Sequence, residues 1–394
     1  MVPAARLRLS YFLYYGYVGT YLPFFAAYLR GLGWSGEQIG TVQMLPSLLS
    51  PAVAIAWATI ADRHRSPAWA LRRAALVAAS AALFLPAART PLALAAVVVV
   101  SALGDRAVVP LLDSVTLEWS RAHPATSYAR VRLFGSLGFV ALAIVAGRAL
   151  ALRGDRAGDP LVPVVVAACV LGYALAAQTV SAPPADADAG ARPGPRDLYR
   201  LLADRRLLAF LGACALHWAA CAPYHLFFGV LVRDRGLEST VAGLGMGVGV
   251  VAEIAVLVAF PRLERRASLR TLLATAFVGS AVRWLLVSRA ESAEAIVLLQ
   301  LLHGLTFGLF WATAMDAMAG LVPPRLRATG QALFSAIVFG AGNAFGYQLA
   351  GRAYDWYGSA APLFAWAAAL ELVALAFAAA FVGGGAREGE PRVA

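Results

Sequence analysis

The chain has 394 residues, of which 60% are hydrophobic and 14% are charged, and its mean hydropathy is +0.70. Soluble proteins usually contain about 45–50% apolar and about 25% charged residues, so this composition excludes an ordinary soluble protein and predicts a chain embedded in lipid. The net charge is +11, and all 33 basic residues are arginine. The arginines stand in short clusters between long apolar runs, which is typical of membrane-protein loops rather than of a face that binds nucleic acid.

Apolar runs of about 20 residues, the length that crosses a bilayer as a helix, recur along the whole chain. They are continuous rather than alternating, which excludes a membrane β-barrel. The first run is too long for the apolar core of a signal peptide and lacks a small-residue cleavage site, so we expect it to remain as a membrane span. Twelve spans are predicted: 9–29, 38–60, 74–88, 91–117, 133–152, 161–180, 206–231, 240–260, 271–288, 294–320, 330–351 and 361–382.

The loop arginines indicate the orientation of these spans. With the N-terminus inside, 22 arginines in the loops or near the span ends fall on the cytoplasmic side and 9 fall on the opposite side. This bias predicts a multi-pass protein of a bacterial inner membrane with both termini in the cytoplasm. The longest polar stretch, 181–205, is rich in Pro, Ala, Asp and Gly and is predicted to be a cytoplasmic linker. It would join an N-terminal bundle (1–180) to a C-terminal bundle (206–382), which a cytoplasmic tail (383–394) follows.

Two short sequence echoes indicate that the halves are copies of one another. Arg-Gly-Leu occurs at 30–32 and 235–237, and Ala-Gly-Arg-Ala occurs at 146–149 and 350–353, so the offsets are 205 and 204 residues. The first match follows the first and seventh spans, and the second lies at the ends of the fifth and eleventh spans. The chain is therefore predicted to be an all-α membrane protein whose twelve transmembrane helices form two pseudo-symmetric six-helix bundles.

The loop between the second and third spans carries Asp62 and Arg63 beside further arginines, and the equivalent loop in the second half, 262–266, also combines an acid with arginines. An acid beside arginines at a helix end can hold two helices together by charge-assisted hydrogen bonds that break when the halves move. We therefore predict that Asp62 and Arg63 belong to a cytoplasmic gate. The alternative is that these arginines only set the membrane topology, which explains the same pattern.

Ionisable side chains within the spans carry a stronger functional signal, because each costs about 2.5–3.5 kcal/mol at a helix centre on insertion scales. We expect most of them to face an aqueous cavity or one another. Asp316 lies near a helix end, where a solvated acid is ordinary, and Glu371 is expected to pack beside lipid or in a dimer contact. The full set is Asp105, Arg106, Asp113, Arg132, Glu253, Arg283, His303, Asp316 and Glu371, and His217 and His225 add two titratable rings.

Five motifs, in chain order, resemble those of the lactose permease and, more closely, of the 3-phenylpropionate permease group of the major facilitator superfamily. They are Pro-Leu-Leu-Asp at 110–113, the segment 127–139, Val-Ala-Glu at 251–253, Val-Arg-Trp at 282–284 and Leu-His-Gly-Leu-Thr-Phe at 302–307. The resemblance covers nearly the whole chain. It implies the twelve-helix fold of that superfamily and transport by alternating access.

The resemblance also implies roles for individual residues. Arg132 and Asp113 would contact the substrate, together with Trp284, whereas Glu253, Arg283 and His303 would link substrate recognition to proton movement. This chain departs from the lactose permease at Thr306, which replaces the glutamate that carries the proton. Threonine cannot bind and release a proton near neutral pH. The coupling proton would therefore be carried by Glu253, Asp113, Asp316 or a His303 coupled to one of them.

The first span is crowded with aromatic residues, and three of them, Tyr17, Tyr21 and Phe24, recur at helical spacing. Aromatic rings suit the face of a sugar or the ring of an aromatic acid, although rings also serve packing and membrane interfaces. We predict that these three residues line the cavity.

These observations predict a secondary active transporter, not an enzyme, that moves a small organic solute and is monomeric. Proton symport of an aromatic or other organic carboxylate is favoured because two arginines, Arg132 and Arg283, are expected in the cavity. A bidentate pairing of Arg132 with Asp113 would instead favour a neutral substrate. A sugar or nucleoside symporter, an efflux antiporter and a non-transporting assembly factor or sensor with a filled cavity remain open alternatives. The expected partners are the solute, protons and the lipid bilayer, with no nucleic acid, cofactor or metal ion, since no Walker loop, dinucleotide fingerprint or clustered metal site is found.

Overall fold

The structure is a computed structural model that describes residues 4–64, 66–180, 199 and 201–382. Within these residues the regular secondary structure is helical and no strand occurs. The predicted tail, 383–394, and most of the predicted linker, 181–205, lie outside the described residues.

The N-terminal half begins most of its helices with a small polar cap. Ser35, Ser66, Thr90 and Ser127 each accept a hydrogen bond from a backbone amide of the first turn, which satisfies a donor that the helix itself leaves free. The helices are α1 (Ala4–Gly31), α2 (Gly36–Arg63), α3 (Pro67–Ala82), α4 (Pro91–Ala122), α5 (Tyr128–Leu152) and α6 (Leu161–Gln178).

Helix α3 corrects the boundaries of the third predicted span, which were placed at 74–88. The apolar run begins only after Arg73, but the helix begins at Pro67, where a proline is well tolerated because the first helical amide has no partner anyway. Arg72 therefore lies inside the helix, and its Nη1 donates to the carbonyl oxygen of Val180 at 3.2 Å. Hydropathy alone missed this start because it counted the arginine as part of a loop.

Three predicted spans of the C-terminal half are interrupted helices. The seventh is divided at Cys221, and the tenth and eleventh contain π-helical segments, which occur often at functional sites. The elements are α8 (Arg205–Ala220), α9 (Ala222–Asp234), α10 (Ser239–Glu264), α11 (Leu269–Arg289), α12 (Ala293–Leu298), η1 (Leu299–Leu302), η2 (Gly304–Leu309), α13 (Phe310–Leu321), η3 (Pro324–Leu326), α14 (Arg327–Phe334), η4 (Ser335–Gly342), α15 (Asn343–Tyr357) and α16 (Ala361–Val382).

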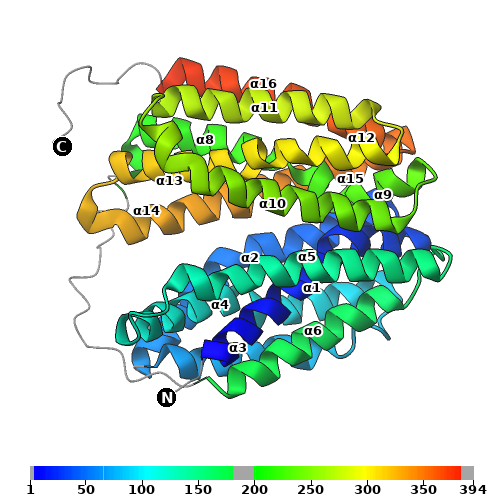
Figure 1. The fold of residues 1–394 in the computed structure, drawn as a ribbon, viewed down its shortest axis with the longest axis horizontal. Coiled ribbons are helices and arrows are strands. Elements are labelled where there is room, and N and C mark those ends of the chain that lie inside the picture. The colour runs from blue at the N-terminus through cyan, green and yellow to red at the C-terminus, as the bar shows by residue number, and fades with distance from the viewer. Residues whose placement is uncertain (1–3, 65, 181–198, 200, 383–394) are drawn as a thin grey trace.

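The helices form two layers. Ten helical segments among the described residues are long and apolar enough to cross a membrane, with α8 and α9, α12 and α13, and α14 and α15 each belonging to a single segment. Helices α1 and α3 pack beside them in the N-terminal half. Figure 1 shows α1–α6 in one layer and α8–α16 in the other, so the predicted fold of two helical bundles is confirmed for the described residues.

The two halves touch backbone to backbone at the end of the molecule opposite the start of α1. A Cβ atom added to Gly351 of α15 would lie 2.4 Å from the carbonyl oxygen of Gly36, and one added to Gly147 of α5 would lie 2.7 Å from that of Ser239. Only glycine permits such close approach. Gly147 and Gly351 are the glycines of the repeated Ala-Gly-Arg-Ala motif, so the repeat places glycine at two equivalent contacts between the halves.

Two carboxylates strengthen this contact, and we call them the carboxylate latches. Asp355, at the end of α15, accepts hydrogen bonds from the amides of Gly36 and Glu37 at 2.6 and 2.8 Å. Asp155, which follows α5, accepts one from the amide of Ser239 at 3.1 Å. Each carboxylate thus caps the positive start of a helix, α2 or α10, that belongs to the other half.

Candidate functional site

A cavity of about 350 Å³ lies between the two halves, within the usual range for small-molecule sites. It is open space rather than a volume filled by side chains, which does not support the non-transporting alternative. The N-terminal half lines it with α1 and α5, and the C-terminal half with α8, α9, α10 and the interrupted tenth span. The lining residues are Tyr15, Val18, Leu22, Arg132, Ser136, Phe139, Trp218, Tyr224, His225, Met246, Val250, Glu253, His303 and Phe307.

Arg132, near the start of α5, supplies the positive charge of the N-terminal wall. It donates from Nη2 to the hydroxyl of Tyr15, and the ring of Tyr15 lies 4.1 Å from the guanidinium carbon. Its Nε is 4.0 Å from Oδ1 of Asp113, and that same oxygen accepts a hydrogen bond from the hydroxyl of Tyr11 at 2.5 Å. The contact between Arg132 and Asp113 is therefore single and long rather than bidentate, so the guanidinium keeps N–H groups available to a ligand.

On the opposite wall, His303 connects the cavity with a buried arginine. Its Nδ1 lies 3.2 Å from Nη2 of Arg283, and its Nε2 lies 3.5 Å from Oε2 of Glu253. An arginine can only donate, so Nδ1 must accept, and the proton of the neutral ring is assigned to Nε2, facing Glu253. While Arg283 keeps this position, His303 has no free nitrogen for a second proton. Glu253 is the carboxyl group of this set that borders the cavity, and its role in proton exchange stays a prediction.

Arg283 and Trp284 lie behind the cavity rather than in its wall. Both side chains are fully buried, and neither belongs to the lining. The rings of Tyr224 and Trp284 lie 4.4 and 4.3 Å from the guanidinium carbon of Arg283, and its Nη2 donates to Gln300 at 2.6 Å. This differs from the expectation that Arg283 is a second cavity arginine and that Trp284 touches the substrate. Arg283 reaches the cavity wall through His303 and Tyr224.

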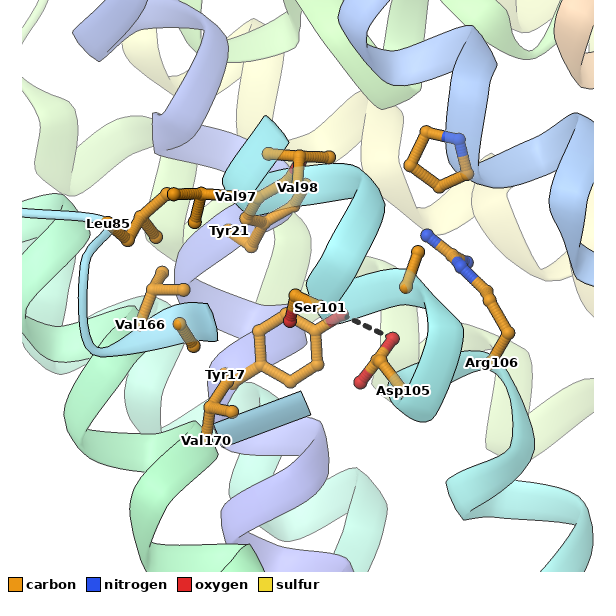
Figure 2. A pocket seen from close by; sticks show the side chains of 13 residues that line it. Tyr17, Tyr21, Leu85, Val97, Val98, Ser101, Asp105, Arg106, Val166 and Val170 are labelled. Atoms are coloured by element: carbon orange, nitrogen blue, oxygen red, sulfur yellow. Dashed lines mark hydrogen bonds between the residues drawn. The ribbon is translucent and has the colours of Figure 1, made fainter. Parts of the chain in front are cut away.

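The predicted aromatic wall of the first span faces a different part of the protein. Tyr17 and Tyr21 line a separate cavity of about 50 Å³ within the N-terminal half, shown in Figure 2. The hydroxyl of Tyr17 donates to Asp105 at 3.0 Å, and Tyr173 donates to the same carboxylate at 3.1 Å. Phe24 is only 2% exposed and does not line the central cavity.

Tyr15, Val18 and Leu22 form the face of α1 that does border the central cavity. They follow the same helical spacing as the predicted trio but are displaced around the helix. No pattern in the sequence distinguishes the two faces, because buried aromatic residues surround α1 on several sides. The expected placement of Tyr17, Tyr21 and Phe24 in the central cavity is therefore corrected, and a substrate contact by them is not supported by this geometry.

The remaining predicted residues lie away from the cavity. Asp316 stands on α13, thirteen positions after His303, which corresponds to about 20 Å along a helix. Asp62, at the end of α2, borders a cavity of about 180 Å³ beside Pro110 of α4. Arg63 is exposed at the same helix end. A proton-carrying role for Asp316 and a gating role for Asp62 and Arg63 stay predictions.

Glu371 is not at a lipid face, which corrects the expectation from the sequence. It is fully buried in the C-terminal half, where its Oε2 lies 2.7 Å from Nδ1 of His217 and its Oε1 accepts a hydrogen bond from Trp284 at 3.1 Å. Cys221 lies on the other side of the imidazole, with its Sγ 4.0 Å from Nε2.

His217, Cys221 and Glu371 also form a group whose ligand atoms lie within 4.8 Å of one another, a cluster that the sequence did not reveal. Metal binding would require all three to converge on one ion. Glu371 adjoins Nδ1 whereas Cys221 adjoins Nε2, and the two ring nitrogens point in different directions. In this arrangement one ion cannot be bound by all three residues, so the cluster does not overturn the prediction that the protein binds no metal.

Several lining residues were not singled out as binding residues from the sequence. Ser136 and Phe139 lie four and seven positions after Arg132, so helical periodicity from that arginine could have found them. Trp218 and His225 flank the break at Cys221. That break could not be anticipated from periodicity, which assumes one continuous helix.

Comparison with known proteins places this geometry in a family. The model of the MFS_1 like family matches residues 4–366. The chain is 28% identical over 362 residues to the probable 3-phenylpropionic acid transporter of Escherichia coli (strain K12), covering 89% of this chain and 91% of that protein. It is 29% identical over 342 residues to the maltose permease of Geobacillus stearothermophilus, covering 86% and 84%.

Solved structures share the fold at lower sequence identity. The nucleoside transporter NupG superimposes with a TM-score of 0.84 at 18% identity, covering 96% of this chain and 98% of that one. A bacterial homologue of the human lysosomal transporter Spinster, in an inward-facing and unoccupied conformation, superimposes with a TM-score of 0.72 at 14% identity, covering 96% and 95%. The family match spans most of the chain and agrees with its two-bundle architecture. The chain belongs to the MFS_1 like family of the major facilitator superfamily, and it is a multi-pass membrane transporter of the secondary type rather than an enzyme.

Proposed function

We propose that the protein carries a small organic carboxylate together with protons across the bacterial inner membrane by alternating access. The observation that carries this proposal is the state of Arg132. Its contact with Asp113 is a single one at 4.0 Å, and Tyr11 occupies the same carboxylate oxygen at 2.5 Å. A cavity arginine that is not paired bidentately can bind the carboxylate of a substrate through two parallel hydrogen bonds.

The apolar part of such a substrate would rest among aromatic and aliphatic side chains. Trp218, Phe307 and Tyr224 line the C-terminal wall, and Val18 and Phe139 line the N-terminal wall. These surfaces suit an aryl or alkyl chain, which gains free energy from leaving water.

Glu253 offers a route for coupling substrate to protons. When Glu253 is protonated, the cavity contains one negative charge fewer, so an anion binds more readily. When it loses the proton, the added negative charge weakens anion binding. Proton and substrate therefore favour each other's binding, and this coupling is reciprocal. His303 presents its Nε2 to Glu253 and gives the carboxylate a polar neighbour in both states.

The arrangement of the halves supports an inward-facing state. The glycine contacts and the carboxylate latches lie at the end opposite the start of α1. With both termini in the cytoplasm, as the arginine bias favours, this closed end faces outward. The carrier would work as a monomer in the bilayer, with residues 1–180 and 206–382 rocking about the cavity and 181–205 linking them.

A neutral sugar or nucleoside is the second candidate. The maltose permease is 29% identical to this chain, and the xanthosine permease of Escherichia coli (strain K12) is 22% identical over 373 residues. The aromatic cavity residues would also suit the face of a sugar or a base.

Binding of a small panel of ligands to the purified protein separates these candidates. The panel contains 3-phenylpropionate, an alkyl carboxylate, maltose and xanthosine, and isothermal calorimetry gives each affinity. We expect the carboxylates to bind and Arg132→Gln to weaken them by about 10- to 150-fold, because a hydrogen bond to a charged group contributes about 1.5–3 kcal/mol. Arg130→Gln, an exposed neighbour outside the cavity, is the matched control. Binding of maltose or xanthosine but of neither carboxylate would reject the proposal.

A further inference from the structure

The C-terminal half contains a second titratable cluster that the central cavity does not use. His217 of α8 and Glu371 of α16 are both fully buried, and the distance between Nδ1 and Oε2 is 2.7 Å. Neither residue lines the central cavity. An ionisable pair buried at membrane depth is costly, and such residues mark ion or proton pathways more often than packing sites.

The hydrogen bonds around the pair determine how many protons it contains. The Nε2 of His217 lies 3.0 Å from the carbonyl oxygen of Thr306, which can only accept, so this nitrogen carries a hydrogen. The other nitrogen faces a carboxylate oxygen at 2.7 Å, a distance that requires a shared hydrogen. That hydrogen belongs either to a protonated Glu371 or to an imidazolium. In both descriptions the pair holds one proton in this bond and is neutral overall.

The surroundings oppose loss of that proton in this conformation. Without it, the imidazole lone pair would face a buried carboxylate at hydrogen-bond distance, and the pair would carry an uncompensated negative charge. The titratable and charged groups facing the pair are Cys221, His225 and Arg283, and Arg283 is the only permanent charge among them. Phe277 and Phe310 cover the imidazole, with ring-centroid distances of 5.3 and 4.0 Å.

The pair contacts the interrupted parts of the seventh and tenth spans. Thr306, whose carbonyl oxygen contacts Nε2 of His217, lies in the π-helical segment η2. This segment begins directly after His303. Trp284 donates to Glu371 and adjoins Arg283, which in turn contacts His303. Cys221 marks the break between α8 and α9. A local rewinding of η2 would therefore remove the Thr306 carbonyl from His217 and alter the group that contacts Glu253.

We propose that His217 and Glu371 form an occluded proton-binding site, which takes up or releases a coupling proton when the tenth span changes its winding. This inference rests on the proposed proton symport and places a coupling proton outside the central cavity. The pair would keep its proton in the inward-facing state described here and would exchange it in another state of the cycle. Proton movement at the pair and substrate binding in the cavity would then be linked through η2 and Arg283.

The Glu371→Gln variant tests the inference because it imitates the protonated acid. A glutamine can donate its amide N–H to Nδ1 of His217 and accept from Trp284, so the packing and both hydrogen bonds can be kept. Wild type and variant are reconstituted in proteoliposomes with the substrate found by the binding panel. We expect counterflow exchange to stay within about twofold of wild type, while accumulation driven by an imposed pH gradient falls by about tenfold or more.

A second variant guards against misfolding of the first. His217→Asn places an amide donor near the position of Nδ1, which stabilises the ionised form of Glu371 and removes the imidazole that shares its proton. The pair should then no longer hold a coupling proton, and we expect the same separation of exchange from accumulation. Glu294→Gln, at an exposed position in the first turn of α12, is the control and should behave as wild type.

Each outcome bears on a definite claim. If the wild type accumulates substrate with the gradient and both variants do so equally well, the occluded site is rejected and the proposed symport stands. If folded variants lose exchange together with accumulation, the pair serves the conformational cycle itself, and the assignment as a proton site is rejected. If the wild type does not respond to the gradient, the proposed symport fails and this inference falls with it.

Discussion

At the scale of single residues, the cavity divides its charges between two walls. Arg132 presents a cation from α5, and Glu253 presents an acid from α10, with Arg283 withdrawn behind His303. In the proposed carrier, Arg132 would recognise an anion while Glu253 would exchange a proton.

Glu253→Gln should leave substrate exchange intact but remove the pH dependence of the affinity for a carboxylate. In the wild type, the affinity for a carboxylate should depend on the charge of Glu253, because its ionised form adds a negative charge to the cavity. The glutamine stays neutral at every pH, so its affinity should remain at the level of the protonated wild type. Calorimetric titrations across a pH series measure this difference, with Glu264→Gln at the end of the same helix as control. If the Glu253→Gln variant keeps the pH profile of the wild type, another residue carries the coupling proton.

Asp159, in the loop before α6, gives a pH-dependent contribution to stability. Burial acts to raise the pKa of this carboxyl, but hydrogen bonds from Arg153 at 2.8 Å and from the amide of Leu161 at 2.9 Å outweigh it, so the pKa lies below its usual value. A lowered folded-state pKa contributes stability that is present at neutral pH and is lost as the pH falls below about 4, through the folded-state pKa.

Thermal unfolding in detergent measures this contribution. We expect Asp159→Asn to lower the unfolding midpoint by a few degrees at neutral pH. Below about pH 4 the midpoint of the variant should fall less steeply than that of the wild type. Arg153→Gln should weaken the same dependence, because it removes the larger of the two stabilising hydrogen bonds. If the unfolding midpoints of wild type and Asp159→Asn fall in parallel as the pH is lowered, this carboxylate does not contribute to the pH dependence of stability.

The residues that could be predicted share one property: they are charged and lie within apolar sequence. Arg132, Glu253 and His303 were found in this way, and the structure brings all three to the central cavity. Tyr17 and Tyr21 were misplaced because aromatic residues are not costly in lipid, so their presence does not reveal which side of α1 faces the cavity. Burial of Glu371 could not be foreseen either, since its partner His217 is 154 residues away.

At the scale of helices, the polar caps between the halves explain how one end is kept closed. Asp355 caps α2, and Asp155 caps α10, so each half supplies the acid for a helix of the other half. The sequence indicated a repeat but not these contacts. A cap joins residues far apart in the chain, and no local pattern distinguishes Asp355 from an ordinary loop acid. The interruptions at Cys221 and in η2 were missed for a similar reason, because hydropathy reports length and not winding.

Asp355→Ala should shift the carrier toward states in which this end is open. A lost helix cap costs about 0.5–2 kcal/mol, which changes the ratio of two states by about 2- to 30-fold. Spin labels at Arg156 and Trp356, exposed positions of the two halves at this end, allow double electron-electron resonance to measure the separation. We expect a larger fraction of long distances in the variant.

The matched control is Asp204→Ala. Asp204 also accepts from backbone amides at a helix start, those of Arg206 and Leu207 at 2.8 and 3.2 Å, and this contact is made within the start of α8. This variant should lower stability without changing the distance distribution. Identical distributions in all three proteins would show that the carboxylate latches do not hold the halves together.

At the scale of the whole molecule, composition and charge predicted the architecture well, because a bilayer imposes simple rules on length and hydropathy. The two halves, their glycine contacts and the cavity between them form a carrier that is closed at one end. What the sequence alone could not supply is the pairing state of Arg132, which depends on the hydroxyl of Tyr11 and the distance to Asp113. That pairing state is the basis for proposing a carboxylate rather than a neutral substrate.

The most direct test of the account is uptake of labelled 3-phenylpropionate by proteoliposomes with an imposed inward pH gradient. Proton-coupled transport of a carboxylate predicts accumulation above the external concentration, collapse of this accumulation when a protonophore is added, and no accumulation by Arg132→Gln. Uptake that reaches the same level with and without the gradient, or that is unchanged in the Arg132→Gln variant, would contradict the proposed proton-coupled transport of a carboxylate.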